Sequence, residues 1–429
     1  MSAEALVAIY EGRVAATVER EGERLTLRYD DGWRRDGPFP LSLSMPLARA
    51  THDHAAVSAF LANLLPDNAR ILEAWGRRFQ VSAERPFRLL AHVGEDCAGA
   101  FAFVRSERVD AFLRAKGRTT WLSDADVAAR LAALRSDVGA SRLPTDRGQF
   151  SLAGAQAKIA LAWRDGRWGV PSGTAATTHI LKPPIPELDG HVENEHFCLR
   201  LASNLGLTAA RSEVAWFGDE VAVVVERFDR RHGAKKSEPV RRVHQEDLCQ
   251  ALGLRPDRKY QADGGPAPAR VAELLRVASS EPERDVAAFA DALLFAWLTG
   301  GTDAHAKNYA LLHGAAGRLR LAPLYDLASA LVYPGYEVRK LKLAMKLGGS
   351  YRLWDVGWRH VEKLAAELGI EAESTSARAR ALADALPDAA RAVAAELGGE
   401  GVTHPIVERL VTALVGRASH ATSRLRSKT

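Results

Sequence analysis

The stretch Thr299-Gly-Gly-Thr-Asp-Ala-His-Ala-Lys-Asn308 decides the fold. It follows a very apolar predicted helix and precedes, after a short hairpin, the segment Ala322-Pro-Leu-Tyr-Asp326. Asp303 and Asn308 stand in the spacing Asp-x-x-x-x-Asn, and Asp326 lies 23 residues after Asp303. Phosphoryl transfer needs a carboxylate to accept the hydroxyl proton, and an amide oxygen and a second carboxylate to hold magnesium. The spacing therefore indicates a phosphotransferase.

Taken singly, these residues have simple structural explanations, since Asp303 could cap a helix and Asp326 could form a turn. Two motifs closer to the N-terminus change the interpretation. The loop Ser151–Lys158 is rich in small residues, which let backbone amides approach an anion closely. Lys182 ends an apolar strand, where a lysine either reaches solvent or points at a bound anion. Small-residue loop, strand lysine and acidic loop follow one another as in kinases.

Other catalytic chemistries lack their motifs in this sequence. Its histidines form no HxxxH or HExxH pair, so a zinc hydrolase would lack its ligands. Gly-x-Ser-x-Gly is absent, which argues against an α/β-hydrolase nucleophile. The loop Ser151–Lys158 is neither a Walker A motif nor a GxGxxG motif, so any phosphate cradle there is of another kind.

Composition excludes several protein classes. The 429 residues are 47% hydrophobic and 26% charged, as in an ordinary soluble globular protein. No apolar stretch approaches the roughly 20 residues of a membrane-spanning helix, and the acidic start does not resemble a signal peptide. Cys97, Cys198 and Cys249 lie far apart and fit reduced packing residues. We therefore expect a cytoplasmic protein with no membrane partner.

The net charge of +5 is unevenly distributed along the chain. The last 25 residues contain five basic residues against Glu408 alone, a local excess of +4. A second basic cluster runs from Arg227 to Arg242. No helix-turn-helix with a basic second helix is visible, so we expect DNA binding only through a partner.

Hydrophobic periodicity predicts a β-rich N-terminal part and a helical C-terminal part. Strands are expected over 5–10, 13–18, 24–29 and 41–47, and a helix follows the last of these around Ala59–Leu65. Ser123 is expected to cap another helix. Two hairpins are expected around Asp165-Gly166 and Gly218-Asp219. Later elements are a strand over 178–182, a strand pair over 309–312 and 319–321, and helices over 192–205, 245–252, 268–278, 284–299, 356–368, 375–397 and 404–418.

Together these residues resemble the HipA family of serine/threonine kinases, the toxins of bacterial toxin–antitoxin pairs. The resemblance runs in order through most of the chain. It includes the two motifs above and the loops at 302–308 and 324–326. It also includes the segments Leu41–Leu47, Asn63–Pro66, Gly94–Ala100, Asn194–His196, Val225–Arg230 and His244–Gly253.

The resemblance implies an α+β, bilobed protein-kinase-like fold. A change to Gly, Ser, Pro, Asp and Arg between Gly139 and Gly148 predicts one domain boundary there. The implied domains are an N-terminal subdomain (1–105), a helical connector (106–148), a small β lobe with phosphate loop and hinge (149–243), and a helical catalytic lobe with a basic tail (244–429).

The resemblance also implies residue roles, with ATP and Mg²⁺ as cofactors. Asp303 would be the catalytic base, and Ser151 the serine that the kinase autophosphorylates to switch itself off. Ala157 departs from the family pattern, where a longer residue is expected, so only its backbone would contribute. The nucleotide and metal would be held by Ala153, Gly154, Ala155, Gln156, Ala157 and Lys158 at the phosphates, Lys182 at the α- and β-phosphates, the hinge residues Glu226, Arg227 and Phe228 at adenine, His305 and Lys307 at the γ-phosphate, Asn308 and Asp326 at magnesium, and Tyr325 beside them.

Substrate and partners follow from the resemblance alone. Family members phosphorylate glutamyl-tRNA synthetase or a related translation protein, and a small helix-turn-helix antitoxin of the HipB type restrains them and carries the pair to operator DNA. Two alternatives stay open. The chain could be a nucleotide-binding pseudokinase that acts through its partner, or a co-repressor subunit of a DNA-binding complex.

Overall fold

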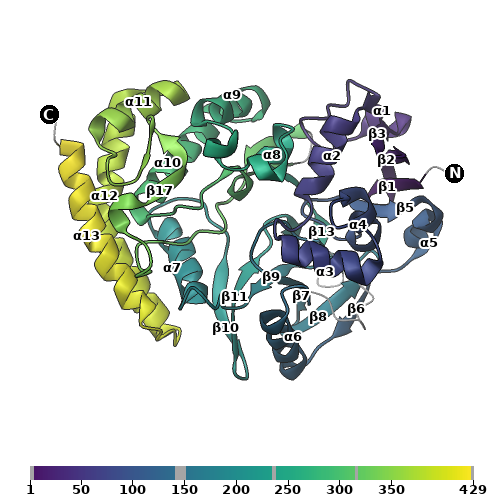
Figure 1. The fold of residues 1–429 in the computed structure, drawn as a ribbon, viewed down its shortest axis with the longest axis horizontal. Helices are drawn as coiled ribbons and strands as arrows, with labels where there is room; N and C mark the ends of the chain where they lie inside the picture. Colours follow the sequence, from purple (N-terminus) through teal and green to yellow (C-terminus); the bar gives the residue numbers. More distant parts are fainter. Residues whose placement is uncertain (1–3, 141–150, 234–237, 315–316, 427–429) are drawn as a thin grey trace. The chain divides into compact units, whose positions relative to one another are not determined.

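The computed structural model describes residues 4–140, 151–233, 238–314 and 317–426. The chain forms two compact units. The first comprises Met1–Pro183, Trp216–Pro256 and Leu311–Arg318, and the second comprises Pro184–Ala215, Asp257–Ala310 and Leu319–Thr429. Both contain helices and strands, which confirms the α+β class (Figure 1). The expected boundary between Gly139 and Gly148 falls almost entirely outside the described residues.

A five-stranded sheet begins the first unit, in the order β4-β3-β2-β1-β5. The predicted antiparallel meander is confirmed, with Leu6 opposite Val18 and Val18 opposite Leu27, all buried. Helix α2 packs beside β3, and α4 beside β5. The elements are β1 (Glu4–Tyr10), β2 (Arg13–Glu21), β3 (Arg24–Tyr29), α1 (Asp31–Asp36), β4 (Thr51–His52), α2 (His54–Asn63), α3 (Ala69–Phe79), α4 (Pro86–Val93), β5 (Ala102–Arg105), η1 (Ser106–Arg108) and α5 (Val109–Arg114).

The strand predicted over Leu41–Leu47 is wrong, because this segment is a loop. Side chains, rather than a neighbouring strand, satisfy its backbone. The Tyr29 hydroxyl accepts from the Leu41 amide (2.8 Å) and donates to the Met45 carbonyl oxygen (2.6 Å). The Glu246 carboxylate accepts from the Leu43 amide (3.0 Å). The alternation of apolar and polar residues does not follow burial here either, since Ser42 is fully buried and Leu43 only partly buried.

A six-stranded sheet also belongs largely to this unit, in the order β10-β11-β9-β7-β8-β6. Both predicted hairpins are confirmed, and Asp165 and Gly166 have the positive φ angles (50° and 74°) of a two-residue turn. Ser123 caps α6 through a capping box with Asp126. The elements are β6 (Arg118–Trp121), α6 (Asp124–Ser136), β7 (Ile159–Arg164), β8 (Arg167–Ser172), β9 (His179–Lys182), β10 (Ser212–Phe217) and β11 (Glu220–Glu226).

Shorter elements complete the first unit. Only the second half of the helix predicted over 245–252 is helical, because the Asp247 side chain accepts from the Gln250 amide and starts the helix there. The elements are β12 (Arg230–Arg231), β13 (Arg241–Arg242), β14 (His244–Asp247), α8 (Leu248–Ala251) and β15 (Ala310–His313), whose first residue belongs to the second unit.

A buried ion cluster joins three segments of the first unit. Asp96 accepts from Arg230 (2.7 Å) and Arg242 (3.3 Å), and Asp229 accepts from both Nε and Nη2 of Arg227 (3.0 and 2.8 Å). Burial alone would raise the pKa of Asp96 and of Asp229, but the surrounding guanidinium groups hold the pKa of each below its usual range. Arg227, Arg230 and Arg242 of the basic cluster 227–242 are therefore part of the internal structure.

The second unit is mainly helical, and the long helices α12 and α13 lie side by side (Figure 1). The sequence did not predict the hairpin β17–β18, which turns at Gly348 and Gly349 with φ angles of 53° and 92°. The elements are α7 (His191–Asn204), η2 (Pro256–Arg258), η3 (Gln261–Asp263), α9 (Pro268–Ala278), α10 (Pro282–Thr299), η4 (Ala306–Asn308), β16 (Leu319–Leu321), η6 (Val338–Lys340), β17 (Lys342–Leu347), β18 (Ser350–Arg352), α11 (Trp358–Leu368), α12 (Ala372–Gly399) and α13 (Ile406–Arg426).

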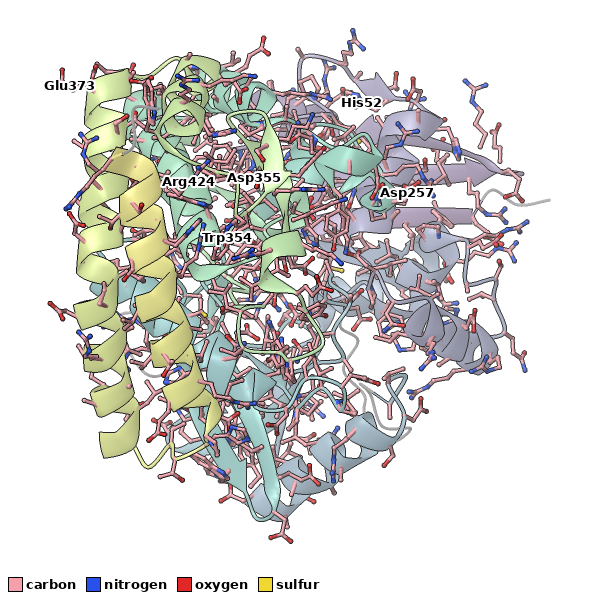
Figure 2. All side chains as sticks on the ribbon, turned by 60° about the vertical axis from the view of Figure 1, so that its left-hand side comes forward. His52, Asp257, Trp354, Asp355, Glu373 and Arg424 are labelled. Atoms are coloured by element: carbon pink, nitrogen blue, oxygen red, sulfur yellow. The ribbon has the colours of Figure 1, made fainter. Side chains whose placement is uncertain are left out.

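Basic residues near the C-terminus are also partly structural. Arg417 on α13 is buried, lies over the Trp297 ring, and donates to the Leu353 carbonyl oxygen (3.0 Å). Burial lowers its pKa to about 10. Arg424 donates to the Asp355 carbonyl oxygen (2.7 Å), and both are labelled with Trp354 in Figure 2. No described helix is both long and apolar enough to cross a membrane.

The buried ion cluster predicts the effect of Asp96→Asn. Removing one charge of a buried, paired set should lower the free energy of unfolding by about 3–5 kcal/mol at pH 7, measured by urea denaturation. The pKa of Asp96 is lower in the folded protein than the roughly 3.9 of a free aspartate, so its stabilisation is complete above that pH. The difference between wild type and variant should therefore narrow as the pH falls below about 4.

The matched control is Asp388→Asn, which removes an exposed ion pair with Arg391 on α12. This change should alter the free energy of unfolding by less than about 1 kcal/mol. An Asp96→Asn protein as stable as this control would contradict a stabilising role for the buried cluster.

Candidate active site

The acidic loop of the second unit follows directly from the end of α10. Gly300 has a φ of 70°, and its N–H and that of Gly301 both bond the Ala296 carbonyl oxygen. A Cβ atom on Gly300 would lie 2.6 Å from Leu331, so glycine is required by both space and conformation. This turn ends a buried helix abruptly and releases residues 301–308 as a loop.

Hydrogen bonds within the loop fix Asp303 and Asn308 relative to each other. The Asn308 Nδ2 atom donates to the Asp303 carbonyl oxygen (2.8 Å), and the His305 amide donates to the same oxygen (2.7 Å). Asn308 is buried, whereas the Asp303 side chain is 68% exposed. The backbone around the predicted base is rigid, and its carboxylate faces solvent.

The loop around Leu324–Asp326 is hydrogen-bonded to the acidic loop 301–308. The Tyr325 hydroxyl donates to the Lys307 carbonyl oxygen (2.6 Å). Leu324 is held from the other side by hydrogen bonds with Thr208 and Ala210 (2.8 Å each). Asp326 follows with a φ of 58°, a left-handed conformation that is uncommon for a residue other than glycine. Such strain often marks functional positions, because the surrounding contacts must enforce it.

Oxygen ligands suitable for magnesium are present in this part of the second unit. The Nδ2 atom of Asn308 is engaged by the Asp303 carbonyl oxygen inside the loop. No described residue donates a hydrogen bond to its Oδ1 atom, which leaves this oxygen as the candidate metal ligand. Asp326 adds a carboxylate. An amide oxygen and a carboxylate are hard ligands, and Mg²⁺ in phosphotransferases is commonly held by one or two carboxylates plus substrate phosphates. The donor set therefore fits magnesium.

One residue beside Asp303, Tyr260, was not predicted as part of the site. Tyr260, just before η3, donates its hydroxyl proton to Asp303 Oδ1 at 2.5 Å. Its ring packs edge-on against the His305 ring, with centroids 5.0 Å apart. The His305 Nε2 atom lies 3.8 Å from the same Asp303 oxygen. No local motif marks Tyr260, because it lies 43 positions before Asp303 and only the fold brings the two together.

Asn194 on α7 holds the segment that follows Asp326. Its amide donates to the Ser329 carbonyl oxygen (2.9 Å) and accepts from the Ser329 amide (2.9 Å). Ser329 in turn donates its hydroxyl proton to the Thr299 carbonyl oxygen (2.6 Å), at the end of α10. All three residues are buried. One network thus connects α7, the start of the acidic loop and the chain beyond Asp326.

The predicted phosphate loop, Ser151–Lys158, lies in the first unit. A hydrogen bond joins the end of this loop to its beginning. Lys158 donates to the Ala153 carbonyl oxygen (2.8 Å). Gly154 has a φ of 110°, and a Cβ atom there would lie 2.5 Å from the Lys158 ammonium nitrogen. Gln156 donates to the Pro183 carbonyl oxygen (3.2 Å). Residues 153–157 are all at least partly exposed, as a loop that presents backbone amides to a ligand must be.

The two predicted phosphate lysines leave the sheet at the same end. Ile159 on β7 pairs with Leu181 on β9 in an antiparallel register. Lys158 and Lys182 are therefore the next residues at the same end of these two neighbouring strands. Val223 on β11 lies opposite Lys182 on its other side. Both lysines are buried. Sequence alone suggested each lysine separately, and the strand register brings them together.

The N-terminal subdomain anchors the phosphate loop. Ser151 is fully buried, and its hydroxyl donates to the Leu64 carbonyl oxygen (2.8 Å). The Asp67 amide donates to the Gly154 carbonyl oxygen (3.1 Å), and the Asn68 side chain to that of Ala155 (3.0 Å). The segment 64–68 therefore forms one wall of the loop.

The predicted hinge follows β11. Glu226 pairs with His179, and the Arg227 amide donates to the Thr178 carbonyl oxygen (2.9 Å). The Arg227 side chain is buried in the ion cluster, so it is committed to structure. Glu226 and Phe228 are both partly exposed.

Comparisons with known proteins agree with the resemblance. Residues 150–393 match the model of the HipA-like C-terminal domain, and residues 6–104 match the model of the HipA N-terminal domain. The chain is 34% identical to a putative kinase of Sinorhizobium fredii over 421 residues, 95% of this chain and 96% of that protein. It is 31% identical over 344 residues to the serine/threonine-protein kinase toxin HipA of Shewanella oneidensis, covering 77% and 75%.

A solved structure gives the same result for the fold. The complex of Shewanella oneidensis HipA with HipB and its operator DNA contains a chain that matches 97% of this one over 97% of its own length, with a TM-score of 0.82 and 26% identity. The chain described here belongs to the HipA family of kinase-like toxins. The resemblance drawn from its motifs is therefore confirmed at the level of the family and of the fold.

The network around Asn194 predicts the effect of Asn194→Ala. This change leaves the buried amide and carbonyl groups of Ser329 without their partner, which should lower the free energy of unfolding by about 1–3 kcal/mol. Urea denaturation measures it. Asn204→Ala, at the exposed end of the same helix, is the control and should cost less than about 1 kcal/mol. Equal losses in the two variants would contradict the importance of the network.

Proposed function

We propose that this protein is an ATP-dependent serine/threonine protein kinase. The observation that carries the proposal is the joined pair of loops in the second unit, in which Asn308 is bonded to the backbone of Asp303 and Tyr325 to that of Lys307. This places a solvent-facing carboxylate, an amide oxygen and a second carboxylate on one fixed backbone. Phosphoryl transfer requires positioning and electrostatic stabilisation more than covalent chemistry, and a fixed set of this kind provides positioning.

Asp303 is the residue suited to accept the proton of the acceptor hydroxyl. Its side chain is exposed enough to meet a hydroxyl on another protein, whereas Asn308 and His305 are buried. Asn308 and Asp326 would hold magnesium, which when bound neutralises charge on the transferring group. His305 and Lys307 lie in the same loop and would border the γ-phosphate.

The nucleotide-binding role falls to residues of the first unit. Lys158 and Lys182 emerge at one edge of the sheet, where two positive charges suit the phosphates of ATP. The loop 153–157 would cover these phosphates with its backbone amides. The backbone at Glu226 and Phe228 would hold adenine, since the Arg227 amide and side chain are already engaged.

Membership in the HipA family is the basis for the proposed substrate and partner. HipA of Shewanella oneidensis assembles with HipB and operator DNA, so we propose a helix-turn-helix antitoxin of that type as the partner and DNA contact through it. We further propose that the kinase acts as a growth-inhibiting cytoplasmic toxin on a translation protein of the glutamyl-tRNA synthetase class.

Asp303→Asn tests the proposed catalytic base. The variant keeps the size of the side chain and loses its basicity, so transfer of labelled γ-phosphate should fall by about 10²–10⁴-fold. The unfolding temperature and ATP binding should stay at the wild-type values. The readout is label incorporated into protein after incubation with Mg²⁺ and γ-labelled ATP.

Asp388→Asn again serves as the control, because Asp388 is exposed on α12 and takes no part in either loop. Undiminished transfer by Asp303→Asn would refute the assignment. ATP binding by wild type without any transfer would favour the pseudokinase alternative instead.

Ser151 is the proposed autophosphorylation site. Its hydroxyl is fully buried against the Leu64 carbonyl oxygen, so a phosphate with nearly two negative charges cannot occupy the same place. The loop would have to leave this position, which would weaken ATP binding. Ser151→Ala should therefore abolish self-labelling and keep transfer to a second protein.

Mass spectrometry of the wild type after incubation with ATP should locate the phosphate on Ser151. The matched control is Ser172→Ala on β8, which should retain self-labelling. Phosphate found on another residue, with Ser151 unmodified, would contradict this role.

A further inference from the structure

Asp303 needs something to hold its carboxylate in one orientation. The loop hydrogen bonds fix its backbone, but its side chain is 68% exposed. The terminal torsion of an aspartate is broad, so an unrestrained carboxylate would sample many orientations. A base must lie within hydrogen-bonding distance of the proton that it accepts, and misplacement of about 1 Å can cost about 10²-fold in rate.

Tyr260 supplies the restraint. Its hydroxyl donates to Asp303 Oδ1, and the His305 Nε2 atom lies on the same oxygen's side at 3.8 Å. No described residue donates to the other carboxylate oxygen, Oδ2. One oxygen is thus bound by the protein itself, and the other faces solvent.

The tyrosine is itself rigidly held. Its carbonyl oxygen accepts from the amides of Asp263 and Gly265 (3.0 and 2.9 Å), which closes a tight turn behind it. A Cβ atom on Gly265 would lie 2.6 Å from that oxygen, so the turn requires glycine. On the ring side, Tyr260 packs edge-on against the buried His305 ring.

Two further bonds connect the tyrosine segment to its surroundings in the second unit. The Lys259 carbonyl oxygen accepts from the Ala306 amide of the acidic loop (3.1 Å). The Gln261 side chain accepts from the Lys346 amide on β17 (2.7 Å). The segment 259–265 is therefore a rigid brace between the acidic loop and the β17–β18 hairpin, and Tyr260 carries its only hydroxyl.

We propose that Tyr260 is a positioning residue that selects Oδ2 of Asp303 as the basic oxygen. This inference rests on the proposed kinase function. In the reaction, the acceptor hydroxyl oxygen forms a bond to the γ-phosphorus, and the bond from that phosphorus to the β,γ-bridging oxygen breaks with its electron pair left on ADP. The hydroxyl proton passes to Oδ2, while Tyr260 keeps its own proton and stays bonded to Oδ1.

The test is Tyr260→Phe, which keeps the ring on His305 and removes only the hydroxyl. Single-turnover phosphoryl transfer should slow by about 10–100-fold, because the carboxylate is free to rotate. The KM for ATP and the unfolding temperature should not change, since the ring and the brace are intact. Tyr351→Phe on β18 is the matched control, with the same chemical change beside the same hairpin, and should transfer at the wild-type rate.

A double variant separates positioning from a general structural role. In an Asp303→Asn protein, Tyr260→Phe should cause no further loss, because the residue acts only through the carboxylate. Equal additional losses in both backgrounds would overturn the proposal. So would a wild-type rate in Tyr260→Phe, or a faster rate, which would mean that the hydroxyl competes with the acceptor. Failure of the kinase function itself is distinguishable, since wild type would then transfer no phosphate or Asp303→Asn would transfer it normally.

Discussion

Buried charge compensation is the constraint on which the first unit depends. Asp96 and Asp229 are buried among three arginines, and each charge is stable only while its partners stay in place. The cluster joins the segment before β5, the chain after β11 and the end of β13. The same Asp96 accepts from the Thr177 amide and hydroxyl, just before β9, which carries Lys182. The position of β9, the strand that carries the proposed phosphate lysine, is thus linked to the N-terminal subdomain by an ion cluster.

In the second unit, hydrogen bonds between uncharged buried groups connect distant segments of the chain. Asn194, Ser329 and Thr299 connect α7 to the end of α10 and to the chain beyond Asp326. Ion pairs of Arg200 with Glu396 and Glu400 further fix α7 to the C-terminal end of α12. These hydrogen bonds and ion pairs make α7 part of the rigid framework of the second unit.

Sequence reasoning recovered the elements whose signals are local. The meander, both hairpins, the Ser123 cap and the polar loop after α10 follow from periodicity, turn residues and capping chemistry. Contacts between residues far apart in the sequence could not be predicted in this way. Leu41–Leu47 has the alternation of a strand, but Tyr29 and Glu246 take its backbone hydrogen bonds. Tyr260 bears no motif at all, and only the fold brings its hydroxyl to Asp303. The candidate site residues were predicted as separate motifs, whereas strand register and loop packing determine which of these candidates lie close together.

The wall that residues 64–68 give to the phosphate loop has a thermodynamic consequence. Because Leu64, Asp67 and Asn68 all bond the loop, its bound and released states differ in free energy partly through the N-terminal subdomain. Coupling of this kind is reciprocal. A ligand that favours one state of the loop changes the affinity of the subdomain for any second ligand that also distinguishes the two states, and the second ligand acts back by the same factor. In the proposed kinase, binding of nucleotide and binding of a partner to the subdomain surface would therefore influence each other through the position of this loop.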